Sequence, residues 1–252
     1  MTILSKFEFG VLRLNIDHPM KRNAINAEMF DTLTEALVQA SQDESVRVVL
    51  LQGGEHIFSA GADLEQMRSA PDILDQSMVR FFEVIKNFPK PIVAQVNGPC
   101  VGEAFTMLLY CDLVYATDKA LFSIPNVALG RAPRFGAAIM MATSAGISRA
   151  AEKLMLSEPI SANEALDMRL ITGVAEEESI DQLVASKVAR LAVLPPQAVH
   201  ATKALLTMSR NQLLNKLTEA EEAIWHRQNQ SAEAQEALAA FLEGRKPSFR
   251  SE

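Results

Sequence analysis

The N-terminal part of the chain shows two different hydrophobic periods. Residues 12–16 alternate apolar and polar side chains, which predicts a strand with one buried face. From 29 to 40 an apolar residue recurs about every four positions behind Asn26, and this predicts a helix of about four turns with Asn26 as its N-cap. The run "VRVVLLQGG" from Val46 is apolar and β-branched before its glycines. It is typical of a strand that is covered on both faces.

The same cycle of helix, buried strand and small-residue bend then recurs. A helical pattern covers about 73–88, the strand "PIVAQVNG" begins at Pro91, and a bend of small residues leads into another helix. After these, "DLVYATD" and "ALFSIPN" are expected to form a strand pair. Repetition of the cycle predicts an α/β protein with helices layered on stacked strands.

The strand signal fades after about residue 161. The sequences of 161–164 and 179–182 match the capping box, which marks a helix start. Further on, the amphipathic stretches are "QAVHATKALLTMS", "NQLLNKLTEAEEAIWHRQNQ" and "SAEAQEALAAFLEG". We therefore divide the chain into a core, 1–195, and a helical C-terminal region, 196–252. Each C-terminal helix has one apolar stripe, which is expected to pack on the core or on a neighbouring subunit.

Composition and charge narrow the classes of partner. The chain has 252 residues, of which 48% are hydrophobic, and this is enough for one substantial core. Its formal net charge of −7 comes from 31 acidic and 24 basic residues and argues against nucleic acid held by bulk electrostatics. An anionic ligand would need a local basic patch, such as Lys21 with Arg22.

Several other classes of protein are disfavoured by the sequence. No apolar run reaches the ~18 residues of a membrane span, so no membrane span is predicted. Cys100 and Cys111 are the only cysteines, and no signal-like stretch opens the sequence, which favours a cytoplasmic location and free thiols. The histidines are scattered and the cysteines are eleven residues apart, so no metal site is predicted. No phosphate loop or dinucleotide fingerprint is present either.

Two segments share one plan of buried strand, small residues and helix start. They are "LLQGGEHIFSAGADL" and "IVAQVNGPCVGEAF". Glycine and alanine let another molecule approach the main chain closely, and the first N–H groups of a helix lack intrahelical partners. Two such groups that converge on one point would form an oxyanion hole. A tight turn that serves packing alone is the alternative for each bend.

Together, in this order and about forty residues apart, these bends resemble the crotonase superfamily, the enoyl-CoA hydratases and isomerases. The likeness extends to "HPMKRNAIN", "EPISANEALDMRLIT" and "SAEAQEALAAFLEGRKPSF", so it covers nearly the full chain. It implies a crotonase spiral of β-β-α units whose C-terminal region, 196–252, helps form trimers or dimers of trimers. Within the superfamily, "FPKPIVAQVNGPCVG" and "DLVYATDKALFSIP" most resemble the peroxisome-type Δ3,Δ2-enoyl-CoA isomerases of fatty acid metabolism.

The resemblance also assigns roles to individual residues. The backbone N–H groups of Ala62 and Glu103 would bind the acyl thioester oxygen and favour the enolate that forms when a proton leaves the adjacent carbon. Coenzyme A is then part of the substrate, and no further cofactor is expected. Lys21 and Arg22 would meet the coenzyme A phosphates. The full set of expected substrate contacts is Lys21, Arg22, Ala24, Ala60, Gly61, Ala62, Asp63, Leu64 and Gly102.

The sequence departs from the family where catalytic carboxylates usually stand. Thr106 and Asn126 occupy the positions of the two hydratase glutamates, and Arg134 occupies that of the isomerase glutamate. Threonine and asparagine do not exchange protons near neutral pH as a carboxylate does, and arginine stays protonated. Ordinary hydration of a double bond is therefore disfavoured.

Three hypotheses follow from these replacements. In the first, the enzyme is isomerase-like and the Glu103 side chain is the base, aimed at the α or γ carbon because a carboxylate beside the enolate oxygen would repel it. In the second, Arg134 receives a carboxylated acyl-CoA, whose decarboxylation to the same enolate needs no protein base. In the third, the chain binds acyl-CoA without chemistry. The structural alternatives are a favourable charge at a helix N-terminus for Glu103 and a surface side chain for Arg134.

Overall fold

A six-stranded sheet forms the centre of the fold, and the computed structural model describes residues 2–249. In spatial order the strands are β1 (Thr2–Glu8), β2 (Val11–Asp17), β3 (Val48–Gln52), β4 (Ile92–Val96), β6 (Leu113–Thr117) and β9 (Gly173–Ala175). The first two strands are antiparallel, and all the other neighbours are parallel. A second sheet contains β5 (Cys100–Val101), β7 (Leu121–Ser123) and β8 (Ile160–Ser161).

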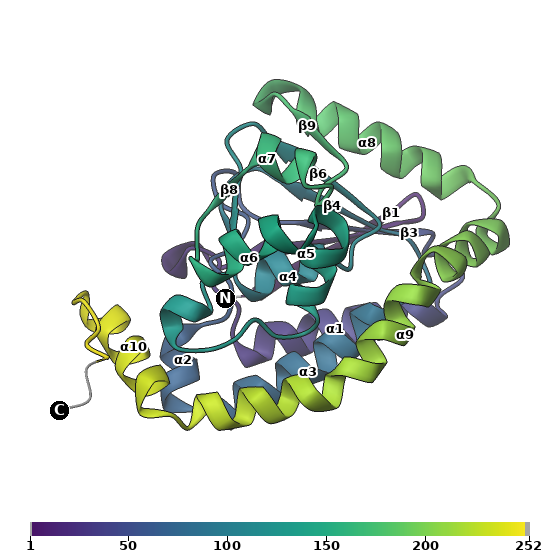
Figure 1. Cartoon of the computed structure of the whole chain (residues 1–252). Helices are drawn as coiled ribbons and strands as arrows, with labels where there is room; N and C mark the ends of the chain where they lie inside the picture. The colour runs from purple at the N-terminus through teal and green to yellow at the C-terminus, as the bar shows by residue number, and fades with distance from the viewer. Residues whose placement is uncertain (1, 250–252) are drawn as a thin grey trace.

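Helices cover the sheet, and the longest of them runs along the outside of the molecule (Figure 1). None of the helices within the described residues is long and apolar enough to cross a membrane. The short 3-10 turns are η1 (Pro19–Lys21) and η2 (Val127–Leu129). The α-helices are α1 (Ala27–Gln42), α2 (Leu64–Ser69), α3 (Pro71–Asn87), α4 (Glu103–Leu108), α5 (Ala137–Ala145), α6 (Ile147–Met155), α7 (Ala162–Asp167), α8 (Glu177–Val193), α9 (Pro196–Asn229) and α10 (Ala232–Glu243).

The apolar run from Val46 forms β3, which is covered on both faces as predicted. Val49 and Leu51 belong to the main core, together with the buried faces of α1 and α3. Val48 and Leu50 face the opposite way and pack in a second cluster with buried residues of α8. Alternation along one strand therefore divides its apolar side chains between two helical layers.

Two of the three predicted helix caps are confirmed. The Asn26 side chain accepts a hydrogen bond from the N–H of Met29 at 2.9 Å, and Ser161 caps α7 through the N–H of Glu164. The prediction for Ser179 was wrong, because α8 begins at Glu177 and the Ser179 hydroxyl donates to a backbone carbonyl instead. Two glutamates in the first turn favour the earlier start, since negative charge is stabilised at a helix N-terminus.

The predicted strand pair between "DLVYATD" and "ALFSIPN" was also wrong. Both segments are strands, β6 and β7, but they lie in different sheets. β6 is hydrogen-bonded along both edges, to β4 and to β9, so it has no edge left for β7. β7 instead pairs with β5 and β8.

The C-terminal helices lie against the core of their own chain. The two stretches expected before "SAEAQEALAAFLEG" form one continuous helix, α9, of 34 residues. Its Lys203 Nζ donates to the carbonyl of Lys90 and to Asp112, both at 2.8 Å. α10 contacts α2 and η2, and a Cβ on Gly130 would lie 2.7 Å from the Cα of Ala234 in α10. The expected contribution of 196–252 to a trimer stays a prediction.

Candidate functional site

The two small-residue bends lie side by side and are hydrogen-bonded to each other. The N–H of Phe58 donates to the carbonyl of Pro99, and the N–H of Val101 donates to the carbonyl of Ser59, each at 3.0 Å. The closest approach is at Gly61, where a Cβ would lie 2.6 Å from the carbonyl oxygen of Val101. Gly61 also has a φ of +89°, which only glycine adopts without strain. This position therefore requires glycine on two independent grounds.

The backbone N–H groups of Ala62 and Glu103 have no acceptor within the described part of the chain. Ile25 is hydrogen-bonded to the residues on either side of Ala62. Its N–H donates to the Gly61 carbonyl at 2.8 Å, and its carbonyl accepts from the N–H of Asp63 at 2.9 Å. In extended backbone the groups of the intervening residue point the other way, so the Ala62 N–H is directed away from Ile25. Glu103 is the first residue of α4, where N–H groups lack intrahelical partners.

Both residues line one cavity of about 190 Å³. Its walls come from the two bends, the start of α2, the loop around η2 and one aromatic side chain from each C-terminal helix, Trp225 and Phe241. Among the described residues on the wall, the polar side chains are those of Glu103, Asn126 and Arg131. An apolar cavity with a few convergent polar groups is the usual form of a small-molecule site.

The side chains at the two hydratase positions differ in where they lie. The Thr106 hydroxyl is buried, donates to the Gly102 carbonyl at 3.2 Å and is not on the cavity wall. Asn126 is on the wall, and its Nδ2 donates to the Ala132 carbonyl at 3.5 Å. Glu103 therefore supplies the single carboxylate among the described residues that line this cavity.

Arg131 reaches the same wall although it is only 5% exposed. Its Nε donates to Oδ1 of Asn229 at 3.1 Å, and its Nη1 lies 3.5 Å from the carbonyl oxygen of Leu129. The guanidinium carbon lies 5.6 Å from the centroid of the Trp225 ring. Burial lowers the pKa of this guanidinium, and the negative charge of Glu103 opposes the shift. Arg131 thus brings a positive charge to a wall that is mostly apolar and also carries Glu103 and Asn126.

Arg134 lies elsewhere, in a buried ion-pair cluster. Its Nε and Nη2 donate to the two carboxylate oxygens of Glu222 at 3.1 and 2.5 Å, and its Nη1 donates to Asp75. The guanidinium also lies 4.7 Å from the centroid of the Trp225 ring, and its side chain is 1% exposed. Arg134 is not a surface residue, and it is not among the residues that line the 190 Å³ cavity.

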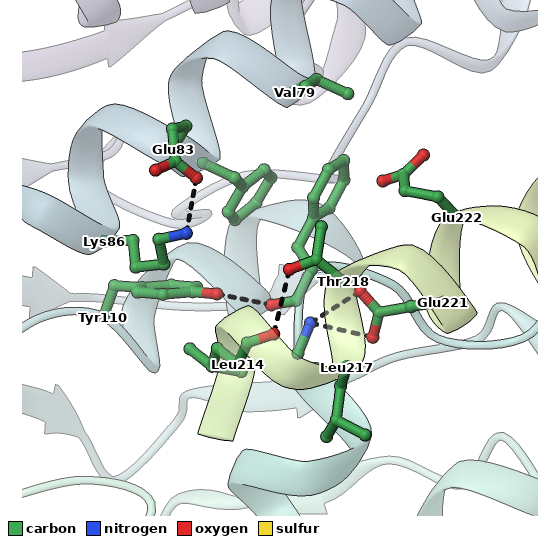
Figure 2. A pocket seen from close by; sticks show the side chains of 12 residues that line it. Val79, Glu83, Lys86, Tyr110, Leu214, Leu217, Thr218, Glu221 and Glu222 are labelled. Carbon is green, nitrogen blue, oxygen red and sulfur yellow. Dashed lines mark hydrogen bonds and ion pairs between the residues drawn. The ribbon is translucent and has the colours of Figure 1, made fainter. Parts of the chain in front are cut away.

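The loop that carries both arginines is fastened along α9. The N–H of Gly136 donates to both oxygens of Glu221, at 3.0 and 3.1 Å, and the N–H of Ala132 donates to Gln228 Oε1 at 2.8 Å. Figure 2 shows the Glu221 end of this contact, where a small cavity of about 60 Å³ lies between α3 and α9. There the Tyr110 hydroxyl donates to the Phe135 carbonyl at 2.7 Å. The loop is therefore held in place by a helix about a hundred residues further along the chain.

Comparison with known protein families matches this sequence to the family described as "Enoyl-CoA hydratase/isomerase" over residues 6–252. The chain belongs to the enoyl-CoA hydratase/isomerase family. Members of this family are enzymes of the crotonase superfamily, so the resemblance stated from the motifs is confirmed. The expected α/β crotonase fold with a helical C-terminal region is confirmed as well.

Some relatives of this chain are named isomerases and others are named hydratases. Rat "Enoyl-CoA delta isomerase 2" is 31% identical in an alignment that covers 97% of this chain but 64% of the rat protein. A "Probable enoyl-CoA hydratase" from Bacillus subtilis is 29% identical over 93% of both proteins. The crystal structure of an enoyl-CoA hydratase/isomerase from Pseudoalteromonas atlantica matches with a TM-score of 0.91 and 31% identity, covering 98% of this chain and 99% of that one.

In this family member the predicted site residues fall into two groups. Those on the cavity wall are Ala60, Ala62, Leu64, Gly102, Glu103 and Asn126. Those outside it are Lys21, Arg22, Ala24, Gly61, Asp63 and Arg134. Gly61 and Asp63 nevertheless shape the site, because Gly61 permits the close approach of the bends and Asp63 caps α2 by accepting from Glu65 N–H at 3.0 Å.

Of the two predicted phosphate contacts of coenzyme A, Lys21 is paired with carboxylates of its own chain. Lys21 Nζ lies 2.8 Å from an oxygen of Asp63 and 2.6 Å from an oxygen of Glu65, and hydrogen bonds to these carboxylates raise the pKa of Lys21. Arg22 is exposed, and its carbonyl accepts from the N–H of Ala60. Ala24 is buried, and its carbonyl is bonded by the ring of His18.

Several residues of the cavity wall were not predicted from the sequence, among them Arg131, Trp225 and Phe241. Arg131 stands in "LGRAPRFGAA", the loop in which only Arg134 drew attention. Trp225 is the one tryptophan of the chain and lies in an amphipathic helical stretch, a signal that could have marked it as a contact residue.

Proposed function

We propose that this protein is an acyl-CoA enzyme that stabilises a thioester enolate between the backbone N–H groups of Ala62 and Glu103. The observation that carries the proposal is that both N–H groups lack an acceptor among residues 2–249 and belong to residues on the wall of one mostly apolar cavity. When a proton leaves the carbon next to a thioester, negative charge moves onto the carbonyl oxygen. Fixed donors at that oxygen bind the enolate more strongly than the substrate and so lower the barrier.

We further propose that the reaction is isomerase-like, a shift of a double bond along the acyl chain. Hydration needs groups that activate a water molecule and supply a proton, and neither Thr106 nor Asn126 is a carboxylate. A double-bond shift needs one base that carries a proton between the α and γ carbons. Glu103 is the carboxylate on the cavity wall and takes this role, while its backbone N–H binds the oxygen.

The proposal is tested by product analysis with matched substrates. The purified protein is incubated separately with a 3-enoyl-CoA and a 2-enoyl-CoA, and the products are separated by liquid chromatography with mass detection. Interconversion of the two enoyl esters is expected. Formation of the 3-hydroxyacyl ester as the main product would show a hydratase instead.

The role of the Glu103 side chain is tested by Glu103→Gln, which keeps the backbone N–H. Loss of a general base lowers the rate by about 10²- to 10⁴-fold. Glu178→Gln in α8 is the control, since Glu178 is exposed and outside the cavity, and it is expected to keep the wild-type rate. A Glu103→Gln variant with an unchanged rate would remove Glu103 from the base role.

We propose that coenzyme A is held by Lys21 and Arg22, and that the subunits associate as trimers or dimers of trimers. Lys21 would exchange Asp63 or Glu65 for a phosphate, so Lys21→Met is expected to raise the Kd of the ester.

The exposed leucines Leu205 and Leu206 on α9 support the proposed contact between subunits. Sedimentation velocity tests the assembly, and a monomer at micromolar concentration would contradict it.

A further inference from the structure

Among the described residues, the buried arginine on the cavity wall is in direct contact with no carboxylate, and Glu103 acts on it only through its charge. The Arg131 side chain is 5% exposed, and within residues 2–249 it forms no ion pair with a carboxylate. Its hydrogen bonds go to neutral oxygens of Asn229 and Leu129, the second at a long 3.5 Å. A buried charge without a counter-charge is costly unless a partner supplies one.

Arg134, in the same loop, is a buried arginine whose guanidinium is fully paired with carboxylates. It stands three residues later, is equally buried, and all three of its guanidinium nitrogens donate to the carboxylates of Asp75 and Glu222. The chain thus provides acidic partners for the arginine that faces away from the cavity. For Arg131, which lines the cavity, the described part of the chain provides no carboxylate in direct contact.

We propose that Arg131 binds a second carboxylate carried by the acyl group, so that the substrates are coenzyme A esters of dicarboxylic acids. This inference rests on the proposed function, because it places the acyl group in the cavity whose wall includes Ala62 and Glu103. A guanidinium and a carboxylate form two parallel charge-assisted hydrogen bonds, and this pairing gives both affinity and orientation.

The surroundings of Arg131 favour this use. Asn229 accepts from Nε, and Trp225 lies against the guanidinium, so the group is oriented before a ligand arrives. The rest of the wall is apolar apart from Asn126 and Glu103, so a carboxylate in the acyl chain finds one cation there. Glu103 repels that carboxylate, which is why we expect it on the side of the guanidinium that is remote from Glu103.

In the hypothesis of a carboxylated substrate, Arg131 replaces Arg134 as the residue that receives the carboxylate. Arg134 was the predicted receptor, but its donors are occupied by Asp75 and Glu222. Arg131 offers the same guanidinium for recognition of the carboxylate, and it lies on the cavity wall.

The test is a comparison of dissociation constants by calorimetry with saturated esters, which have no double bond to shift. Glutaryl-CoA, adipyl-CoA and methylmalonyl-CoA are each paired with the neutral ester in which an isopropyl group replaces the carboxylate. At least one carboxylated ester is expected to bind about tenfold or more tightly than its neutral counterpart. Preference for methylmalonyl-CoA would place the carboxylate at the α carbon, and preference for glutaryl-CoA or adipyl-CoA would place it at the far end of the chain.

Variants separate recognition from structure. Arg131→Met is expected to abolish the preference for the carboxylated ester and to leave the Kd of the neutral ester within about twofold, while Arg131→Lys keeps part of the preference. Arg190→Met in α8, an exposed position, is the control and should change neither value. If Arg131→Met weakens both esters equally, Arg131 only supports the wall and the inference is wrong.

The outcomes also distinguish this inference from the proposed function. If neutral esters bind and no carboxylated ester binds more tightly, the dicarboxylic substrate is excluded while the acyl-CoA site survives. If no coenzyme A ester of either kind binds, the proposed function itself fails. The wild-type comparison decides the matter even if the Arg131 variants do not fold.

Discussion

The guanidinium of Arg134 lies 4.7 Å from the centroid of the Trp225 ring, and Trp225 forms part of the candidate acyl cavity. The ion pairs of Arg134 with Asp75 of α3 and Glu222 of α9 therefore fix one wall of the site from outside. Arg134, at the position where the resemblance implies a catalytic glutamate, thus supports the wall of the candidate site instead.

Arg134→Met is expected to lower the free energy of unfolding by about 2–4 kcal/mol, because it leaves two carboxylates without their buried partner. The lower end applies if water reaches Asp75 and Glu222, which are 23% and 29% exposed. Arg80→Met is the control: its pair with Asp31 is exposed, and the loss should stay within about 1 kcal/mol. Urea denaturation measures both, and equal losses would contradict the buried cluster.

Gly61→Ala is expected to damage the site more than the fold. The added methyl would lie 2.6 Å from the Val101 carbonyl and would force the two bends apart. Strain at a positive φ costs on the order of 1–3 kcal/mol, and displacement of the bends should lower turnover by more than tenfold. Gly146→Ala has a similar φ of +85° but meets nothing within 4 Å, so it should lose stability and keep its turnover. Normal turnover in Gly61→Ala would argue against the bends as the site.

The difference in stability between the wild type and Tyr110→Phe should depend on pH in the alkaline range. Burial raises the pKa of the Tyr110 hydroxyl above its usual value of about 10. Above that pH the unfolded chain releases the proton while the folded chain keeps it, so the wild type loses stability there and the variant does not. Near neutral pH the variant should be about 1–2 kcal/mol less stable, because the Phe135 carbonyl loses its donor. The difference should narrow above pH ~10, and a constant difference would contradict the raised pKa.

Much of the fold and half of the site could be predicted because their signals are local. Asn26 caps the helix that follows it, and the small residues 60–62 mark their own bend. The missing parts depend on contacts between distant segments. Arg131 is buried by Trp225 and Asn229, the latter 98 residues away, and Lys21 is held by acids 42 and 44 residues away. β7 was assigned the wrong partner because the sequence does not show that β4 and β9 occupy both edges of β6.

The central claim is that the N–H groups of Ala62 and Glu103 hold a thioester enolate. It is tested most directly by exchange of α protons for deuterium in heavy water, followed by NMR on a bound saturated acyl-CoA ester. The account predicts enzyme-dependent exchange at the α carbon, slowed by more than tenfold in Gly61→Ala. Tight binding of esters with no α-proton exchange in any of them would contradict it and leave an acyl-CoA-binding protein without chemistry.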